Sequence, residues 1–223
     1  MPPIPPSGDR SLLRRDAEHN RRRILAAARK LIAERGLGVG YDEIAREADV
    51  GVGTVYRRFP TRDGLYYELF YDRVDAVVGI AEEALAVEDP WLGLCQFMRR
   101  DFELQTSDRG LREFLLGRAD STDLGQRSRE RIQPLVTELV ERAQAAGRLR
   151  AELGQSDIAI ILAMLGGLID ASLPVEPDLW RRYLAMVLNG IQCGARDDEF
   201  PGEPPDQPQL DRILARWVPP RRA

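Results

Sequence analysis

Apolar residues follow the 3.6-residue period of an α-helix along almost the whole chain. Ile24, Leu25, Ala28, Leu31 and Ile32 form one such stripe, which is the pattern of a helix that buries a single face. Nowhere does the sequence alternate apolar and polar residues over the length of a β-strand. The pattern therefore predicts an all-α protein.

Glycine and proline residues divide this pattern into separate helices. Gly36, Gly38 and Gly40 follow the first stripe, and Pro60 ends a later one because the residue before a proline avoids helical dihedrals. Pro134 lies inside another stripe and predicts either a kink or a helix start nearby. We expect helices at about 16–35, 42–48, 52–58, 62–87, 90–105, 109–119, 124–146, 157–173 and 177–193, and a short one at about 210–217.

Size and composition set the broad class. The 223 residues allow one or two domains, and contents of 43% hydrophobic and 30% charged residues are typical of soluble globular proteins. The longest apolar run, residues 158–169, is shorter than the roughly 18 residues that a membrane-spanning helix needs. The first residues, MPPIPPSGDR, lack the pattern of a secretory signal. We expect a cytoplasmic protein with no membrane partner.

The sequence offers little for catalysis or metal binding. It has one histidine and two cysteines, Cys95 and Cys193, which are far apart in the chain. It contains no Gly-rich phosphate loop, no serine nucleophile elbow and no metal-ligand spacing. We expect no metal site, no cofactor and no enzymatic activity, and we expect both cysteines to be buried apolar residues.

Charge is distributed unevenly. Residues 1–62 carry 13 basic and 8 acidic side chains, a net charge of +5, although the whole chain has a net charge of −4. A basic N-terminal part joined to an acidic remainder indicates a small nucleic-acid-binding module on a larger body. The alternative is a solvated, charged helix.

Residues 42–59, DEIAREADVGVGTVYRRF, contain two helices of about seven residues on either side of a short turn at 49–51. Ala45 and Ala48 are small enough for the two helices to cross closely. The predicted inward residues are Ile44, Ala45, Ala48, Val50, Val52, Val55 and Phe59. This pattern is typical of a helix-turn-helix, whose second helix enters the DNA major groove.

The helical period turns Gly53, Thr54, Arg57 and Arg58 outward from the second helix. A glycine lets the backbone approach DNA closely. A threonine can bond a phosphate or touch a thymine methyl group, and arginine forks match guanine or phosphate oxygens. A role in surface solubility is the alternative for the arginines.

Residues 21–69 resemble the DNA-binding domain of the tetracycline-repressor (TetR) family of bacterial regulators. The matching stretches are RRRILAAARKLIAERG and DEIAREADVGVGTVYRRFPTRDGLY. The positions that meet the family pattern are Ile44-Ala45, Val50, Gly53-Thr54, Tyr56 and Phe59, with Arg62 where a lysine is more usual. Asp49, Gly51 and Gly40 depart from it, because the family more often has a turn glycine, a serine cap and a threonine there.

The predicted DNA-binding residues come from the helical pattern and from the family resemblance. Helix starts near Tyr41 and Arg62 offer free amides to phosphates. The resemblance implies that the Tyr56 hydroxyl reaches a phosphate, whereas helical geometry alone leaves Tyr56 between core and DNA face. The full set is Tyr41, Arg46, Gly51, Val52, Gly53, Thr54, Tyr56, Arg57, Arg58 and Arg62.

The last two long helices are candidates for a dimer interface. The helix at 157–173 is apolar nearly all round, and Gly166-Gly167 would allow another helix to come close. Two such helices from each of two chains would form a four-helix interface. The predicted interface residues are Ile158, Ile161, Leu162, Leu165, Leu168, Ile169, Tyr183, Met186, Val187 and Gly190. The alternative is that both helices fill the core of one chain.

Aromatic and methionine residues after position 90 are candidates for a ligand pocket. They are Trp91, Phe97, Met98, Phe102, Phe114, Leu115 and Met164. Such a stripe at helical spacing is also what an ordinary core contains. The family resemblance implies a small-molecule effector, and these residues suggest an apolar or aromatic one.

The expected organisation follows. Residues 1–15 are a disordered N-terminal segment, 16–61 a helix-turn-helix DNA-binding domain, 62–195 a larger helical ligand-binding and dimerisation domain, and 196–223 a Pro-rich acidic tail. We expect a transcriptional repressor that binds a palindromic double-stranded DNA operator as a homodimer and is released by the effector. The alternative is a small-molecule carrier or an enzyme with incidental N-terminal helices.

Overall fold

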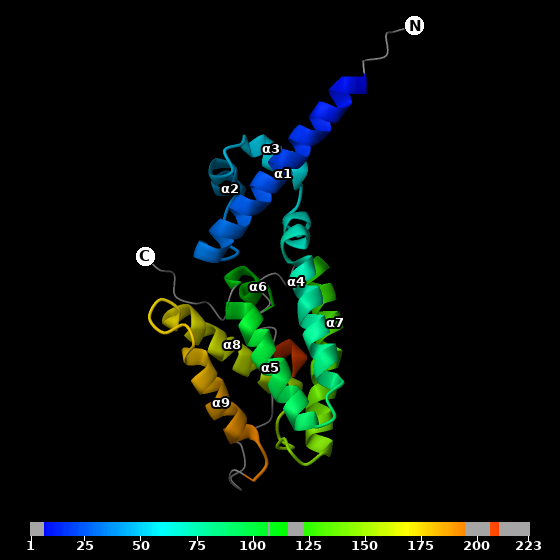
Figure 1. Ribbon diagram of the computed structural model, residues 1–223, viewed down its shortest axis with the longest axis vertical. Coiled ribbons are helices and arrows are strands. Elements are labelled where there is room, and N and C mark those ends of the chain that lie inside the picture. The colour runs from blue at the N-terminus through cyan, green and yellow to red at the C-terminus, as the bar shows by residue number, and fades with distance from the viewer. Residues whose placement is uncertain (1–6, 107, 116–122, 195–205, 210–223) are drawn as a thin grey trace. The chain divides into compact units, whose positions relative to one another are not determined.

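The computed structural model describes residues 7–106, 108–115, 123–194 and 206–209. Within these ranges the chain forms helices, turns and one isolated antiparallel bridge between Leu149 and Gln192, with no β-strand. The all-α prediction is therefore confirmed (Figure 1). The helices are α1 (Ser7–Arg35), α2 (Tyr41–Glu47), α3 (Val52–Arg58), α4 (Arg62–Leu85), α5 (Pro90–Thr106), α6 (Arg109–Glu113), α7 (Asp123–Ala145), α8 (Gln155–Ser172) and α9 (Leu179–Ile191).

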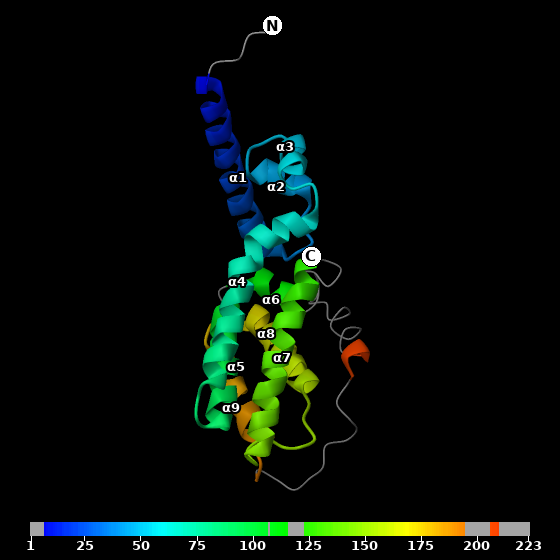
Figure 2. The same ribbon diagram turned by 90° about the vertical axis from the view of Figure 1, so that its right-hand side faces the viewer.

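The helices divide into two compact units, Met1–Tyr71 and Asp72–Ala223. The division falls inside α4, which contributes residues to both units. The first unit contains α1, α2 and α3, and the second contains the bundle of α5, α7, α8 and α9 (Figure 2).

The first helix starts earlier than the sequence suggested. It begins at Ser7 rather than near residue 16, so α1 includes residues 7–15, which the sequence placed in a disordered segment. No proline occurs between Pro6 and Pro60, and the leucine and arginine residues of this stretch favour helix. The helix ends where Gly36 takes a φ of 80°, a conformation that favours glycine.

The core of the first unit consists of the apolar stripe of α1 and the inward residues of α2 and α3. The buried members include Ile24, Leu25, Ala28, Leu31, Ile32, Ile44, Ala45, Ala48, Val55 and Phe59. Val52 was also expected to face inward, but 39% of its surface is exposed. It is the first residue of α3, where Gly51 is the N-cap, so no preceding turn of helix covers it.

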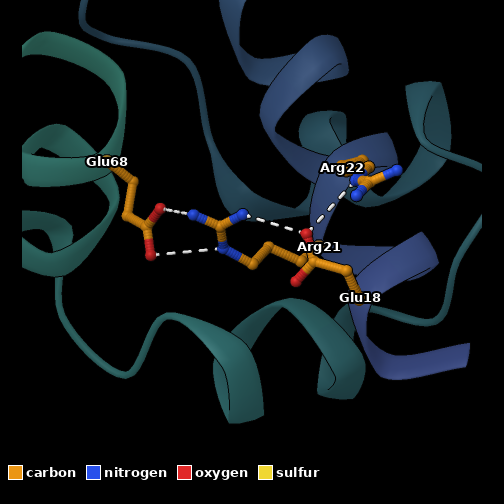
Figure 3. Close-up of polar contacts among 4 residues, drawn as sticks. All are labelled: Glu18, Arg21, Arg22 and Glu68. Atoms are coloured by element: carbon orange, nitrogen blue, oxygen red, sulfur yellow. Dashed lines mark hydrogen bonds and ion pairs between the residues drawn. The ribbon is translucent and has the colours of Figure 1, made fainter. Parts of the chain in front are cut away.

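Two polar contacts join α1 and its following loop to the first half of α4. Arg21 on α1 donates two hydrogen bonds to the Glu68 carboxylate and a third to Glu18 (Figure 3). The Tyr66 hydroxyl donates to the Leu37 carbonyl oxygen at 3.1 Å. Two parallel bonds from a planar guanidinium fix orientation as well as distance. These bonds hold the first half of α4 to α1 and to the loop that follows α1.

In the second unit, α5 packs against α6, α7, α8 and α9. Its inward stripe contains Leu94, Phe97, Met98 and Phe102, all buried. The Phe102 ring lies 5.5 Å from the ring of Trp180 on α9, centroid to centroid. A core of this kind is stabilised by apolar surface removed from water.

Three features of the second unit differ from or refine the sequence expectation. Pro134 lies within the continuous helix α7, so the helix does not start there. The α6 helix covers Arg109–Glu113, and residues 116–119 of the helix expected there lie outside the described residues. Cys95 is buried as expected, but Cys193 is exposed, which corrects its prediction. The expected helix at about 210–217 lies outside the described residues.

The α8 helix is long and apolar enough to cross a membrane by length and composition, with a mean hydropathy of 1.3. The core helix of a soluble protein meets the same two criteria. Here Ile158, Leu165 and Ile169 of α8 are buried in the core of the second unit.

Candidate nucleic-acid interface

The turn between α2 and α3 is held by backbone geometry. Asp49 has a φ of 49°, which an aspartate tolerates better than most residues. The Val50 N–H donates to the Ala45 carbonyl oxygen at 3.0 Å and closes the end of α2. Arg23 on α1 donates to the Asp49 carboxylate and carbonyl oxygens, both at 2.9 Å. These bonds fix the angle at which α3 leaves the turn.

The start of α2 is ordered by an acidic side chain. The Gly40 N–H donates to the Glu43 carboxylate at 2.9 Å. This bond, together with the nearby Arg35 and Arg46 charges, holds the pKa of Glu43 below its usual range. Arg46 itself is exposed on α2.

The outer face of α3 is open to solvent. Gly51, Gly53, Arg57 and Arg58 are exposed, Thr54 is half-buried, and 55% of the surface of Tyr56 is exposed. This placement favours the DNA-facing interpretation of Tyr56 over the core one. The helix thus presents two arginines, a hydroxyl and an aromatic residue together on its outer surface.

Glycine at position 53 is not required by packing within the unit. A Cβ atom built on Gly53 would have no neighbouring atom within 4 Å. Glycine also costs helix stability relative to alanine. Its presence therefore fits a requirement from outside the chain, such as the close approach of a backbone to DNA.

The arginines of α3 differ in their contacts. Arg57 donates to the Thr54 hydroxyl oxygen at 3.2 Å. For Arg58, neither a hydrogen bond nor an ion pair is found among the residues that the structure describes. Its guanidinium is therefore available for base edges or phosphates.

Tyr41 contacts Tyr56 of α3, and Arg62 contacts Tyr41. The buried Tyr41 ring meets the Tyr56 ring edge-on at 4.9 Å, and its hydroxyl donates to the Thr61 carbonyl oxygen at 2.9 Å. Burial raises the pKa of Tyr41. Arg62 is half-buried, donates to the Leu37 carbonyl oxygen at 3.1 Å and lies over the Tyr41 ring. In this structure both side chains are engaged within the first unit, so a phosphate contact by the Arg62 side chain would require it to leave these partners.

The residues expected to line a pocket differ in their burial. Phe97, Met98 and Phe102 are buried in the core of the second unit, and Trp91 packs against that core. Phe114 is buried and Leu115 half-buried directly after α6. Met164 on α8 differs from them, because 52% of its surface is exposed.

The residues expected at a dimer interface form two groups. Ile158, Leu165 and Ile169 are buried within the chain. The others are half-buried or exposed, namely Ile161, Leu162, Leu168, Tyr183, Met186, Val187 and Gly190. The second group leaves apolar side chains of α8 and α9 on the surface of the second unit.

The sequence interpretation missed a set of buried polar residues in the second unit. Asp101 and Gln105 on α5 and Arg112 on α6 are each at least 97% buried. The spacing held a signal, because Asp101 and Gln105 continue the apolar stripe of α5 at helical intervals. No group of three or more histidine, cysteine or acidic residues that could hold a metal occurs in the described part of the chain.

Comparison with known proteins matches both units to one class. Residues 24–69 match the family model described as bacterial regulatory proteins, tetR family. Residues 89–193 match the model described as transcriptional regulator SbtR-like, C-terminal domain. The fold and the exposed α3 thus define a helix-turn-helix transcriptional regulator.

Solved structures of other regulators are similar to this chain. A TetR transcription regulatory protein from Mycobacterium vanbaalenii is 33% identical, with 81% of this chain and 99% of that one covered and a TM-score of 0.44. The regulator FadR from Bacillus subtilis, solved with stearoyl-CoA, is 18% identical over 76% of this chain and 98% of its own, with a TM-score of 0.55. The chain belongs to the TetR family of transcriptional regulators.

Curated relatives match only part of the chain. An HTH-type transcriptional regulator of Staphylococcus aureus is 36% identical over 67 residues, which is 30% of this chain. The chain thus matches 36% of the length of that relative.

Proposed function

We propose that this regulator is a repressor that binds a palindromic operator as a homodimer and leaves it when a small-molecule effector binds the second unit. The observation that carries the DNA-binding part is the exposed face of α3, where Gly53, Arg57 and Arg58 lie together. A helix of this size fits the major groove, which is about 12 Å wide. The net positive charge of residues 1–62 supports attraction to the phosphate backbone.

A dimer is needed because one short helix reads only a few base pairs. Two recognition helices about 34–36 Å apart read two half-sites on one side of the duplex. Exposed apolar residues on α8 and α9 support these helices as the contact surface, with 52% of the surface of Met164 and 56% of that of Met186 exposed. Their burial against a second copy would remove this apolar surface from water.

The α4 helix offers a connection between effector and operator. Its first half is bonded to α1 by Arg21 and Glu68, and Ile80, Ala81 and Ala84 of its second half join the core of the second unit. An effector that favours one packing of that core would therefore bias how α4 is held. A difference of about 1–3 kcal/mol between the two states would change operator affinity several-fold to about 100-fold.

The test is a binding titration with the full chain. An operator is first selected from a random duplex library, and its affinity is then measured by fluorescence anisotropy over a range of salt concentrations. We expect a steep fall in affinity with salt, because cations are released from the neutralised phosphates. Size-exclusion chromatography with light scattering should give a dimer, with two chains on each selected duplex.

The Arg58→Ala variant should lose operator affinity, whereas Arg99→Ala, on an exposed α5 position of the second unit, should not. A monomer that binds no duplex at low salt would contradict the proposal. Equal affinities of Arg58→Ala and the unmodified chain would contradict the role of α3.

A further inference from the structure

The inward stripe of α5 changes from apolar to polar near the end of the helix. Leu94, Met98 and Phe102 on this stripe are fully buried. Asp101 and Gln105 continue it, with only 2% and 3% of their surfaces exposed. A carboxyl group and an amide are thus enclosed next to an aromatic core.

These two side chains satisfy each other only in part. The Gln105 Nε2 donates to the Asp101 Oδ2 at 2.5 Å. Asp101 Oδ1 and Gln105 Oε1 are buried acceptors with no hydrogen-bond partner among the described residues. Buried acceptors without donors destabilise a fold, so a pair of them on one helix face is a feature that needs an explanation.

The neighbouring Arg112 is bonded to other partners. Arg112 donates to the Gln105 carbonyl oxygen at 2.5 Å and to the Asp170 carboxylate on α8. Gly166 leaves room for it, because a Cβ at that position would lie 2.9 Å from the Arg112 Cδ. Asp101 is therefore a buried acid without a cationic partner among the described residues, and burial raises its pKa to about 7.

We propose that Asp101 and Gln105 form the head-group site for a small amine, which is the effector of this regulator. The ammonium group carries three N–H donors, of which one reaches Asp101 Oδ1 and another Gln105 Oε1. Its positive charge supplies the partner that the buried carboxylate lacks. The apolar body of the amine lies along the apolar part of the same stripe, near Met98 and Phe102. This inference rests on the proposed function, since it names the effector's chemical class.

The burial of the site connects binding to regulation. Both acceptors are enclosed by protein, so an amine binds only a state in which the helices around α5 make room for it. A ligand that binds one of two states shifts the population toward that state. Amine binding would therefore alter the packing of α5 against its neighbours.

The test uses the full chain at pH 8, where the Asp101 carboxyl is ionised. Isothermal titration calorimetry is carried out with methylammonium, butylammonium and benzylammonium chloride, with benzyl alcohol and toluene as neutral probes. Each probe is measured on the unmodified chain, on Asp101→Asn and on Asp72→Asn. Asp72 is exposed on α4, so this variant makes the same chemical change away from the site.

We expect at least one amine to bind, with affinity about 10-fold or more weaker in Asp101→Asn and unchanged in Asp72→Asn. Benzyl alcohol and toluene should bind more weakly than benzylammonium. The absence of binding by all three amines, equal binding by Asp101→Asn, or benzyl alcohol binding as tightly as benzylammonium would each overturn the amine site. Far-UV circular dichroism checks that the variants are folded.

A duplex-binding measurement on the same samples separates this inference from the proposed function. If the chain binds its selected duplex but no amine, the amine site is wrong and the regulator remains. If it binds an amine through Asp101 but no duplex, the proposed function is wrong. An effector should in addition change duplex affinity in the unmodified chain and not in Asp101→Asn.

Discussion

The two units of this chain place their polar residues in opposite ways. In the first unit, the polar side chains of α3 lie on the surface, and Arg58 extends from a helix whose other face is packed. In the second unit, Asp101, Gln105 and Arg112 lie inside the core. Exposed polar groups keep their hydration until a partner arrives, whereas enclosed ones need partners within the fold. The contrast suggests that the first unit recognises a large charged surface and the second a small enclosed group.

The largest expected effect is the pH dependence that Asp101 gives to the stability of the fold. Burial raises the pKa of Asp101 to about 7 in the folded chain, above its ordinary value of 3.8. The folded state therefore binds the proton more tightly than the unfolded state does. The resulting contribution to the free energy of unfolding is fully present at low pH and is lost as the pH rises through about 7. The full difference of about three pKa units corresponds to about 4 kcal/mol.

Chemical denaturation at pH 5 and pH 8.5 measures this effect. We expect Asp101→Asn to unfold at higher denaturant than the unmodified chain at pH 8.5, with a smaller difference at pH 5. Asp72→Asn should follow the unmodified chain at both values. A stability difference that does not depend on pH would show that Asp101 is not a buried acid.

The next largest effect comes from the buried arginine. Arg112→Ala removes the partner of both the Gln105 carbonyl oxygen and Asp170. Loss of one member of a buried ion pair costs about 3 kcal/mol or more. The exposed pair between Arg100 and Glu83 offers the control, because Arg100→Ala should cost less than about 1 kcal/mol. Urea denaturation of both variants checks this, and equal losses would remove the contrast between enclosed and exposed charges.

On the surface of α3, Arg58→Ala should weaken operator binding by about 10-fold to 100-fold, as expected for loss of one base or phosphate contact. Stability should change little, because Arg58 is exposed. Anisotropy with the selected duplex and urea denaturation together distinguish the two properties. A variant that lost stability instead of affinity would make Arg58 a structural residue.

The smallest expected effect is that of Gly53→Ala, which should raise stability and lower operator affinity. Gly53→Ala should raise stability by about 0.5–1 kcal/mol, because alanine favours the helix and meets no neighbouring atom within the chain. The same methyl group should weaken operator binding several-fold if the helix backbone approaches DNA there. Unchanged operator affinity would mean that position 53 does not face the duplex closely.

The sequence predicts the first unit better than the second. The α3 face follows from helical period and from a motif in which Gly53, Thr54 and Phe59 stand at fixed spacing. Even there, the helical period predicted that Val52 faces inward, whereas it is exposed. It also did not predict the hydrogen bond from Arg62 to the Leu37 carbonyl oxygen. A local sequence pattern does not show that a residue is the first of its helix, nor that a side chain contacts a distant loop.

In the second unit, the function of the buried polar residues depends on contacts between distant positions. Asp101 and Gln105 stand on an apolar stripe, but their surroundings include Arg112 and, through it, Asp170, which is 58 positions further on. Spacing within one helix shows neither that these groups are enclosed nor which of their atoms lack partners. The exposure of Cys193 and Met164 was likewise decided by packing between helices.

Cross-linking tests most directly whether α3 lies in the major groove of DNA. Cys193→Ser removes the exposed thiol, and Val52→Cys then places a thiol at the start of α3. A selected duplex carries a thiol tethered to a base in the major groove of each half-site. We predict disulfide cross-links from Val52→Cys, up to two chains per duplex, and none from a Glu82→Cys control on the second half of α4. Equal cross-linking by both variants, or none by Val52→Cys in a duplex that is demonstrably bound, would contradict the account.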